Sequence, residues 1–314
     1  MAEIIVEKEW TKEPAGRRIF GNFIESGFGR QVNGMWSEML YNRAFRDVPA
    51  IKIATWEWLG LDKEHYNSNA PFWHSGYEEN DWEVIGAPER EHTCGTHTYK
   101  GMTSLLLKNT DGSECGLLQK GLHLQKGKRY QFRIFAGVRG DMSEAGLNGF
   151  GDTIHSEKAE LLTVKIGTQE TSFALTTVPR LFTWEWEEAC GGTAQICLTF
   201  SFPGTLVLSF ASLMPADNLG GWRADVVEKL KEAAPSVVRF PGGCFVSFYN
   251  WESSIGDRDR REPQPSFYWG GLEENDVGLD EFLQLSRLVG FEPQLCFNMM
   301  TSEPFKARQM VEYL

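Results

Sequence analysis

The sequence lacks the signatures of several common protein classes. Its six cysteines are scattered without any CxxC spacing, so neither a zinc nor a redox motif is indicated, and free thiols fit a reducing compartment. Basic residues are outnumbered, 31 against 43 acidic ones, and the net charge of −12 argues against nucleic acid or an anionic membrane as partner. The first residues show no basic region followed by an apolar one, so we expect no signal peptide. No apolar run is long enough to cross a membrane, so we expect no membrane span and a cytoplasmic protein. No cofactor and no metal are expected, whereas a neutral ligand such as a sugar remains open.

Histidine is missing from the two regions with helical patterns, because all six histidines fall between His65 and His155. Aromatic residues, by contrast, are plentiful: 11 Trp and 21 Phe suit either sugar stacking or a large β-rich core, and we favour the core for most of them. With 314 residues, the chain is long enough for two domains.

Residues 237–251 are the most informative stretch. A β-branched run, typical of a buried strand, stops at Pro241-Gly242-Gly243, and small polar and aromatic residues follow at once. A strand that ends in a glycine turn and then presents polar side chains resembles the rim of a parallel barrel, where the loops carry the chemistry. The alternative is an ordinary strand and loop with incidental aromatics.

The surrounding pattern indicates α/β units. Apolar spacing predicts helices at 223–233, 278–288 and 305–314, and a strand at 293–297. Near the start, we expect a strand at 18–24 and a helix at 36–45. The alternation of helix and strand is typical of a parallel sheet.

Between residues 54 and 214 the pattern changes to short alternating runs separated by turn signals. This predicts an antiparallel β-sandwich. Trp184 and Trp186 alternate along one run, so both rings share one face of a strand, which we assign to the core rather than to a sugar-stacking platform. The glycine-rich residues 140–151 are interpreted as a loop, with a calcium site as the alternative.

Several motifs, in order, resemble those of glycoside hydrolase family 51, the α-L-arabinofuranosidases. They are Ile19-Phe20-Gly21-Asn22-Phe23-Ile24-Glu25, Gly34-Met35-Trp36-Ser37-Glu38, Arg239-Phe240-Pro241-Gly242-Gly243-Cys244 and Asn275-Asp276-Val277-Gly278-Leu279-Asp280-Glu281-Phe282. The resemblance covers residues 19–45 and 216–314 well and the middle only loosely. It implies an α/β plus all-β fold: an incomplete (β/α)8 TIM barrel of about three βα units with an inserted jelly-roll-like β-sandwich. The expected boundaries are 1–50 and 216–314 for the barrel and 51–215 for the sandwich, which is similar to a carbohydrate-binding module.

The same resemblance implies which residues hold the sugar: Glu25, Cys244, Trp269 and Asn298. Each has a plainer alternative, namely a surface carboxylate for Glu25, a loop-closing ring for Trp269 and a loop cap for Asn298. Cys244 stands where many relatives have asparagine, which puts direct hydrogen bonding there in doubt. Cys244 also lacks a nearby histidine in the sequence, which argues against a cysteine nucleophile. Glu281 is expected to support the scaffold.

Retaining glycosidases need two carboxyl groups, and in this family the acid/base lies in a Gly-Asn-Glu motif. No such motif occurs here, so we expect no catalytic residue in the chain and both glutamates beyond Leu314. A whole barrel also needs about 250 residues outside any insertion. Expected partners are therefore an arabinofuranosyl oligo- or polysaccharide and the remainder of the barrel, in the same gene or a second chain; a homo-oligomer is left open. The alternatives are an endo-β-1,4-glucanase or β-xylosidase of the same family, or a non-catalytic carbohydrate-binding fragment.

Overall fold

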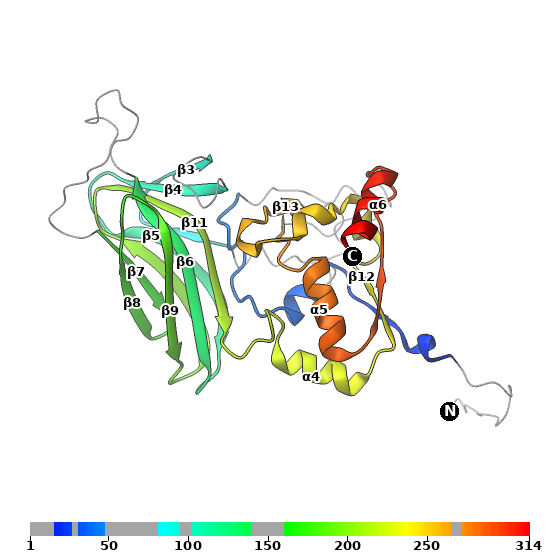
Figure 1. Cartoon of the computed structure of the whole chain (residues 1–314). Coiled ribbons are helices and arrows are strands. Elements are labelled where there is room, and N and C mark those ends of the chain that lie inside the picture. Colours follow the sequence, from blue (N-terminus) through cyan, green and yellow to red (C-terminus); the bar gives the residue numbers. More distant parts are fainter. Residues whose placement is uncertain (1–15, 27–30, 48–80, 95–101, 140–159, 266–271) are drawn as a thin grey trace, which may run out of the picture.

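The computed structural model describes residues 16–26, 31–47, 81–94, 102–139, 160–265 and 272–314. The fold is a mixed α/β architecture in which most strand pairs are antiparallel. Two groups of elements are visible in Figure 1: two five-stranded sheets on one side, and a small sheet with helices on the other. Trp269 and residues 140–151 lie outside the described residues, so the structure does not bear on their predicted roles.

The two five-stranded sheets pack on a common hydrophobic core. The first has the order β2-β5-β10-β7-β8 and the second β3-β4-β11-β6-β9. The strands of the first sheet are β2 (Glu83–Ile85), β5 (Cys115–Leu124), β10 (Gly192–Phe200), β7 (Leu161–Ile166) and β8 (Gln169–Ala174). Those of the second are β3 (Glu89–Cys94), β4 (Thr103–Asn109), β11 (Gly204–Pro215), β6 (Arg129–Arg139) and β9 (Arg180–Glu187).

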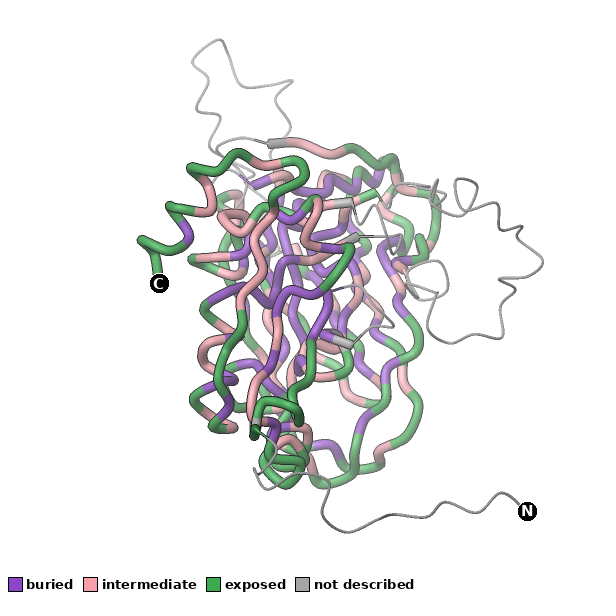
Figure 2. The backbone as a smooth tube through the Cα atoms, turned by 90° about the vertical axis from the view of Figure 1, so that its right-hand side faces the viewer, coloured by how far each residue is buried: buried purple, intermediate pink, exposed green. Residues whose placement is uncertain are grey.

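The alternation of the sequence explains this packing. Leu162, Val164 and Ile166 of β7 point into the core and are fully buried, and Phe132 and Ile134 of β6 do the same from the opposite sheet. Because side chains on a strand alternate between faces, the intervening polar residues face outward. Figure 2 shows the buried stretches gathered in the interior of the molecule. The predicted antiparallel strands in this region are confirmed.

Trp184 and Trp186 share one face of β9, as predicted, and that face is the core. Their rings stack with centroids 4.3 Å apart. Trp186 is buried against Tyr130, and Trp184 packs partly buried on the same cluster. Neither ring forms an exposed platform, so the core assignment is confirmed.

The smaller sheet is parallel, with the order β1-β12-β15. Its strands are β1 (Asn22–Phe23), β12 (Val237–Phe240) and β15 (Glu292–Leu295). Helices α4 (Ala224–Ala233), α5 (Leu279–Val289) and α6 (Pro304–Tyr313) confirm the three predicted helices of this region. Phe240 stacks on Phe282 of α5 with centroids 4.8 Å apart, which packs this helix on the sheet. A two-stranded pair, β13 (Gln264–Pro265) with β14 (Leu272–Glu273), lies nearby.

The start of the chain departs from the sequence-based expectation. The strand predicted at 18–24 is reduced to β1, and it is preceded by a short 3-10 helix, η1 (Arg17–Phe20). The helix predicted at 36–45 is absent, and a short helix, α1 (Gln31–Met35), ends just before it. The backbone of this segment bonds to distant partners instead: Ser37 to Gly221, Met39 to Leu213, and Tyr41 to the Gln119 side chain. Tertiary contacts therefore override an apolar pattern that would suit a helix.

A buried ion-pair network joins this segment, the sandwich and the loop after β12. Arg43 is 3% exposed, and its guanidinium lies 3.1 Å from Asp259 and 2.7 Å from Asp276. Arg133 of β6 contributes a second cation to Asp259 at 3.0 Å. Arg258 pairs with Asp276 at 3.3 Å and lies 3.8 Å from Asp259, so Asp276 faces two arginines and Asp259 faces three. The network fixes how the sandwich meets the parallel sheet.

Candidate functional site

The carboxyl ends of the three parallel strands bring the predicted site residues to one edge of the sheet. The chain after β1 bonds to the chain after β12 through Ile24 N to Arg239 O (2.8 Å) and Ser26 N to Pro241 O (3.2 Å). On the other side, Cys296 N donates to Phe240 O at 2.9 Å. Glu25, the Gly242–Cys244 turn and the chain leading to Asn298 thus meet where ligands bind in open parallel sheets.

Glu25 is the best positioned of the three predicted residues that the structure describes. It is 5% exposed, and its carboxylate accepts hydrogen bonds from Gly243 N to Oε2 (2.9 Å) and from Phe245 N to Oε1 (3.2 Å). The alternative of an exposed surface carboxylate is therefore wrong. Two backbone amides hold the negative charge in place, as charge-assisted hydrogen bonds do.

Gly242 makes this seating possible. Its φ of +114° lies in the region that favours glycine, and a Cβ there would meet Glu25 Cβ at 2.3 Å. Any side chain at position 242 would displace Glu25. The glycine turn that the sequence singled out is thus the wall of the Glu25 site.

The other predicted residues differ in placement. Cys244 begins the 3-10 helix η4 (Cys244–Phe248) and is exposed beside the Glu25 turn. The Asn298 side chain bonds to its own loop, accepting from Met300 N (3.1 Å) and Thr301 N (3.0 Å) and donating to Tyr249 O (3.2 Å). Asn298 therefore acts as a loop cap that also ties down the loop after β12. Trp269 falls outside the described residues.

Three further charged or polar groups were not predicted as site residues, although two of them, Arg239 and Tyr249, lie in the stretch 237–251 that the sequence singles out. Burial raises the pKa of Glu273 to about 8, helped by the charges of Glu274 and Asp276 and opposed by a hydrogen bond from Asn275 N. Burial also raises the pKa of Tyr249, whose hydroxyl bonds to the Ser254 hydroxyl. Glu273 lies in a run of acidic residues, and nothing in such a run signals which carboxyl will be buried.

Arg239, on β12, is the third group. Its guanidinium lies over the Phe23 ring at 5.2 Å, and its buried Nε has no hydrogen-bond partner among the described residues. Arg239 and Glu25 both influence the Cys296 thiol, whose pKa is raised chiefly by burial. A cation also lies near the Glu25 carboxylate, because a Cβ at Gly243 would lie 3.2 Å from Glu25 Oε2 and 3.9 Å from Arg239 Nη2.

Glu281 supports the scaffold, as predicted. It accepts from Gly278 N at 2.8 Å, capping α5, and pairs with both terminal nitrogens of Arg261. Within the described ranges, no group of three or more His, Cys, Asp or Glu side chains is arranged to hold a metal ion. No helix in the described part of the chain is long and apolar enough to cross a membrane.

Comparisons with known proteins point to one family. Residues 229–312 match the family model for the α-L-arabinofuranosidase 1 domain. The α-L-arabinofuranosidase C of Emericella nidulans is 42% identical over 99 residues, which is 32% of this chain and 20% of that protein. An intracellular exo-α-(1→5)-L-arabinofuranosidase of Bifidobacterium longum is 39% identical over 100 residues, 32% of this chain and 18% of that protein.

A solved structure extends the likeness to the rest of the fold. The arabinose-bound MgGH51 α-L-arabinofuranosidase matches 96% of this chain and 49% of its own length, with a TM-score of 0.68 and 18% identity. At that identity the match supports the fold alone. The chain spans about a fifth of the curated relatives and about half of this structure. Residues 229–312 thus resemble part of an α-L-arabinofuranosidase, and the chain spans only part of the length of these relatives.

Proposed function

We propose that this chain supplies the substrate-binding side of a retaining α-L-arabinofuranosidase that releases terminal arabinofuranose from arabinoxylan- or arabinan-type chains. The observation that carries the proposal is the Glu25 carboxylate, buried and held by two backbone amides at the carboxyl edge of the parallel sheet. A carboxylate oxygen can accept more than one hydrogen bond, and in this proposal Glu25 accepts further bonds from sugar hydroxyls. The degradation of hemicellulose and the metabolism of L-arabinose are the corresponding processes.

In this proposal the parallel sheet is the first part of a (β/α)8 barrel, at residues 1–50 and 216–314, and residues 51–215 form an inserted jelly-roll-like sandwich. Support comes from chain order, because the sandwich strands lie between β1 and β12, which are paired neighbours. Both edge strands, β1 and β15, have only β12 as a partner among the described strands. Apolar side chains are exposed at these edges, including Phe23 (44%) and Met299 (66%). Further strands would cover them, as closure of a barrel does.

The roles of the site residues follow from their positions. Glu25 would accept bonds from sugar hydroxyls, and Cys244 would line the pocket beside it. Asn298 would hold the loop after β12 in shape rather than contact sugar in the state described here. Trp269, which lies outside the described residues, would contact the sugar.

The two reactive carboxylates would come from polypeptide other than these 314 residues. Retaining enzymes place such groups about 5–5.5 Å apart, and the sequence has no Gly-Asn-Glu motif to provide the acid/base. We expect this chain alone to release no 4-nitrophenol from 4-nitrophenyl α-L-arabinofuranoside, and the protein completed by its remaining strands to do so. Activity of the completed protein on aryl β-xyloside or β-glucan alone would instead favour the β-xylosidase or endo-β-1,4-glucanase alternative.

A non-catalytic carbohydrate-binding protein is the alternative from a different class. It would bind polysaccharide and show no hydrolysis even when completed. We further propose that the activity is intracellular, because the bifidobacterial relative is named so.

A further inference from the structure

The segment that holds Glu25 is a short 3-10 helix, η4, at the carboxyl edge of the parallel sheet. Glu25 bonds to the amino end of this helix, through the amides of Gly243 and Phe245. A 3-10 helix of five residues has hydrogen bonds of poorer geometry than an α-helix, so contacts from outside η4 fix its position. Those contacts determine how firmly the Glu25 carboxylate is held.

The carboxyl end of η4 is held by the loop after β15. The Thr301 hydroxyl donates to Ser247 O at 2.6 Å, and the Asn298 side-chain amide donates to Tyr249 O at 3.2 Å. The same amide donates to the Thr301 hydroxyl at 3.0 Å. The Thr301 oxygen is therefore an acceptor within its own loop and a donor to η4.

Through Ser247, Thr301 is connected to the amides at Glu25. The ring of Tyr249, the residue after η4, packs on the ring of Phe245 with centroids 5.5 Å apart. Both rings are buried, so the two ends of η4 share one packed contact. Glu25 holds one end of this five-residue element, and Thr301 holds the other.

A second contact joins the same two regions of the chain further along. Lys306 of α6 pairs with Glu252 at 2.5 Å, and the Trp251 indole donates to Lys306 O at 3.2 Å. Glu252 and Trp251 belong to the next 3-10 helix, η5 (Trp251–Ser254). This contact supports η5 rather than η4, so it offers a comparison for the role of Thr301.

We propose that Thr301 is a positioning residue for Glu25: its hydroxyl fixes the carboxyl end of η4 and thereby the amides that hold the Glu25 carboxylate. The consequence for sugar binding rests on the proposed function, whereas the positioning rests on these contacts alone. Thr301 is exposed, and its hydroxyl makes a neutral hydrogen bond to η4. Loss of one such bond shifts an opening equilibrium by about three- to tenfold.

The test is amide hydrogen exchange of the 314-residue chain, measured by mass spectrometry over residues 243–248. In Thr301→Val, exchange of this segment should be about threefold or more faster than in the parent chain. Thr301→Ser keeps the hydroxyl and should restore the parent rate. Exchange in α5, whose Phe282 and Leu285 are fully buried, should stay unchanged in both variants.

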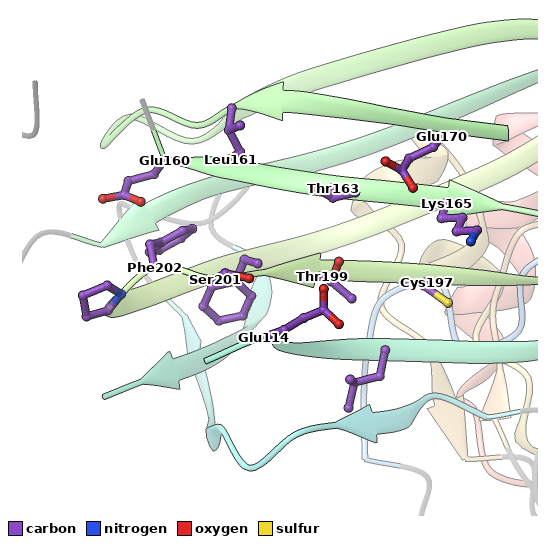
Figure 3. A pocket seen from close by; sticks show the side chains of 13 residues that line it. Glu114, Glu160, Leu161, Thr163, Lys165, Glu170, Cys197, Thr199, Ser201 and Phe202 are labelled. Carbon is purple, nitrogen blue, oxygen red and sulfur yellow. The ribbon is translucent and has the colours of Figure 1, made fainter. Parts of the chain in front are cut away.

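Two control variants separate this contact from general effects. Thr199→Val makes the same chemical change far along the chain, in a hollow on the outer face of the β2-β5-β10-β7-β8 sheet, where Thr199 lies opposite Thr163 (Figure 3). Lys306→Met removes the neighbouring ion pair to η5. Both controls should leave exchange over residues 243–248 within about twofold of the parent chain.

The completed protein provides a second measurement. Thr301→Val should lower kcat/KM on 4-nitrophenyl α-L-arabinofuranoside by about threefold or more, chiefly through a higher KM, and Thr301→Ser should recover it. Faster exchange with unchanged kcat/KM would support the positioning and refute a role of Glu25 in sugar binding.

Thermal unfolding shows whether each variant is folded. The proposal is overturned if folded Thr301→Val exchanges like the parent chain over residues 243–248, or if α5 accelerates equally. It is also overturned if Thr301→Ser behaves like Thr301→Val, or if Lys306→Met has the same effect. The exchange assay needs neither sugar nor hydrolysis, so an inactive completed protein would refute the hydrolase without deciding the positioning, which the exchange rates decide.

Discussion

Removing the Arg43 guanidinium should strongly destabilise the protein. In Arg43→Met, Asp259 and Asp276 keep their burial but lose the cation at 3.1 and 2.7 Å. Breaking a buried ion pair from one side typically costs about 3–5 kcal/mol. Because Arg133 and Arg258 still face the two aspartates in the variant, the cost should lie at the lower end of this range, about 3 kcal/mol. We expect a loss of that size in the free energy of unfolding at pH 7, measured by urea denaturation.

The loss should depend on pH in a defined direction. Burial alone would raise the pKa of Asp276, but the charges of Arg43 and Arg258 outweigh it and hold the pKa below its usual value. The ion pairs of Asp276 therefore stabilise the parent protein fully above the pKa of an aspartate in the unfolded chain, about 3.9. This stabilisation is lost as the pH falls through the lower pKa of Asp276 in the folded protein. In the variant the buried carboxyl resists ionisation, so acid relieves its penalty. The gap between parent and variant should shrink from pH 7 toward pH 4.

Arg308→Met is the control, since Arg308 pairs with Glu312 on the exposed surface of α6 at 2.7 Å. It should change stability by no more than about 0.5 kcal/mol. A cost for Arg43→Met that matches this control, or one that does not vary with pH, would refute the buried network as the joint between sandwich and sheet.

Two further predictions concern the site itself. Gly242→Ala should lower the free energy of unfolding by more than about 2 kcal/mol, because the new Cβ would overlap Glu25. Gly127→Ala is the control: its φ is +75° but the space around it is open, so the substitution should cost about 1 kcal/mol. Equal shifts of the unfolding temperature in the two variants would contradict this. Glu273 has a folded pKa near 8, above the ordinary value of about 4.3, so the stability linked to its protonated form is complete at low pH and lost as pH rises through 8. The free energy of unfolding of Glu273→Gln, measured by urea titration, should therefore rise relative to that of the parent as the pH increases from 5 to 9. A difference between the two proteins that stays constant over this range would contradict a raised pKa at Glu273.

The strand alternation of the middle region predicted the sandwich because a period of two survives wherever one face is buried. Leu162, Val164 and Ile166 are fully buried, which confirms the antiparallel strand with one buried face that the alternation predicts. The helices at 224–233 and 279–289 were equally predictable, since each buries one stripe and ends at a left-handed residue, Ala234 or Gly290. Local pattern and tertiary packing agree in these elements.

The sequence-based predictions fail where contacts between residues far apart in the sequence determine the local structure. Residues 36–45 carry a helix-like pattern, but their backbone groups bond to Gly221, Leu213 and Gln119, which no local pattern reveals. Glu25 was recognisable only through its family resemblance, because the amides that hold it lie more than 200 residues away. The raised pKa of Glu273 depends on burial by surrounding chain, and the sequence contains no sign of it.

The most direct measurement compares kcat/KM on 4-nitrophenyl α-L-arabinofuranoside for the completed protein and its Glu25→Gln variant. Loss of a charged hydrogen-bond acceptor should lower kcat/KM by about tenfold or more. Glu292→Gln, at an exposed position whose carboxylate pairs with Arg18, should leave it within about twofold. If Glu25→Gln retains full activity while remaining folded, the sugar does not bind at this edge of the sheet.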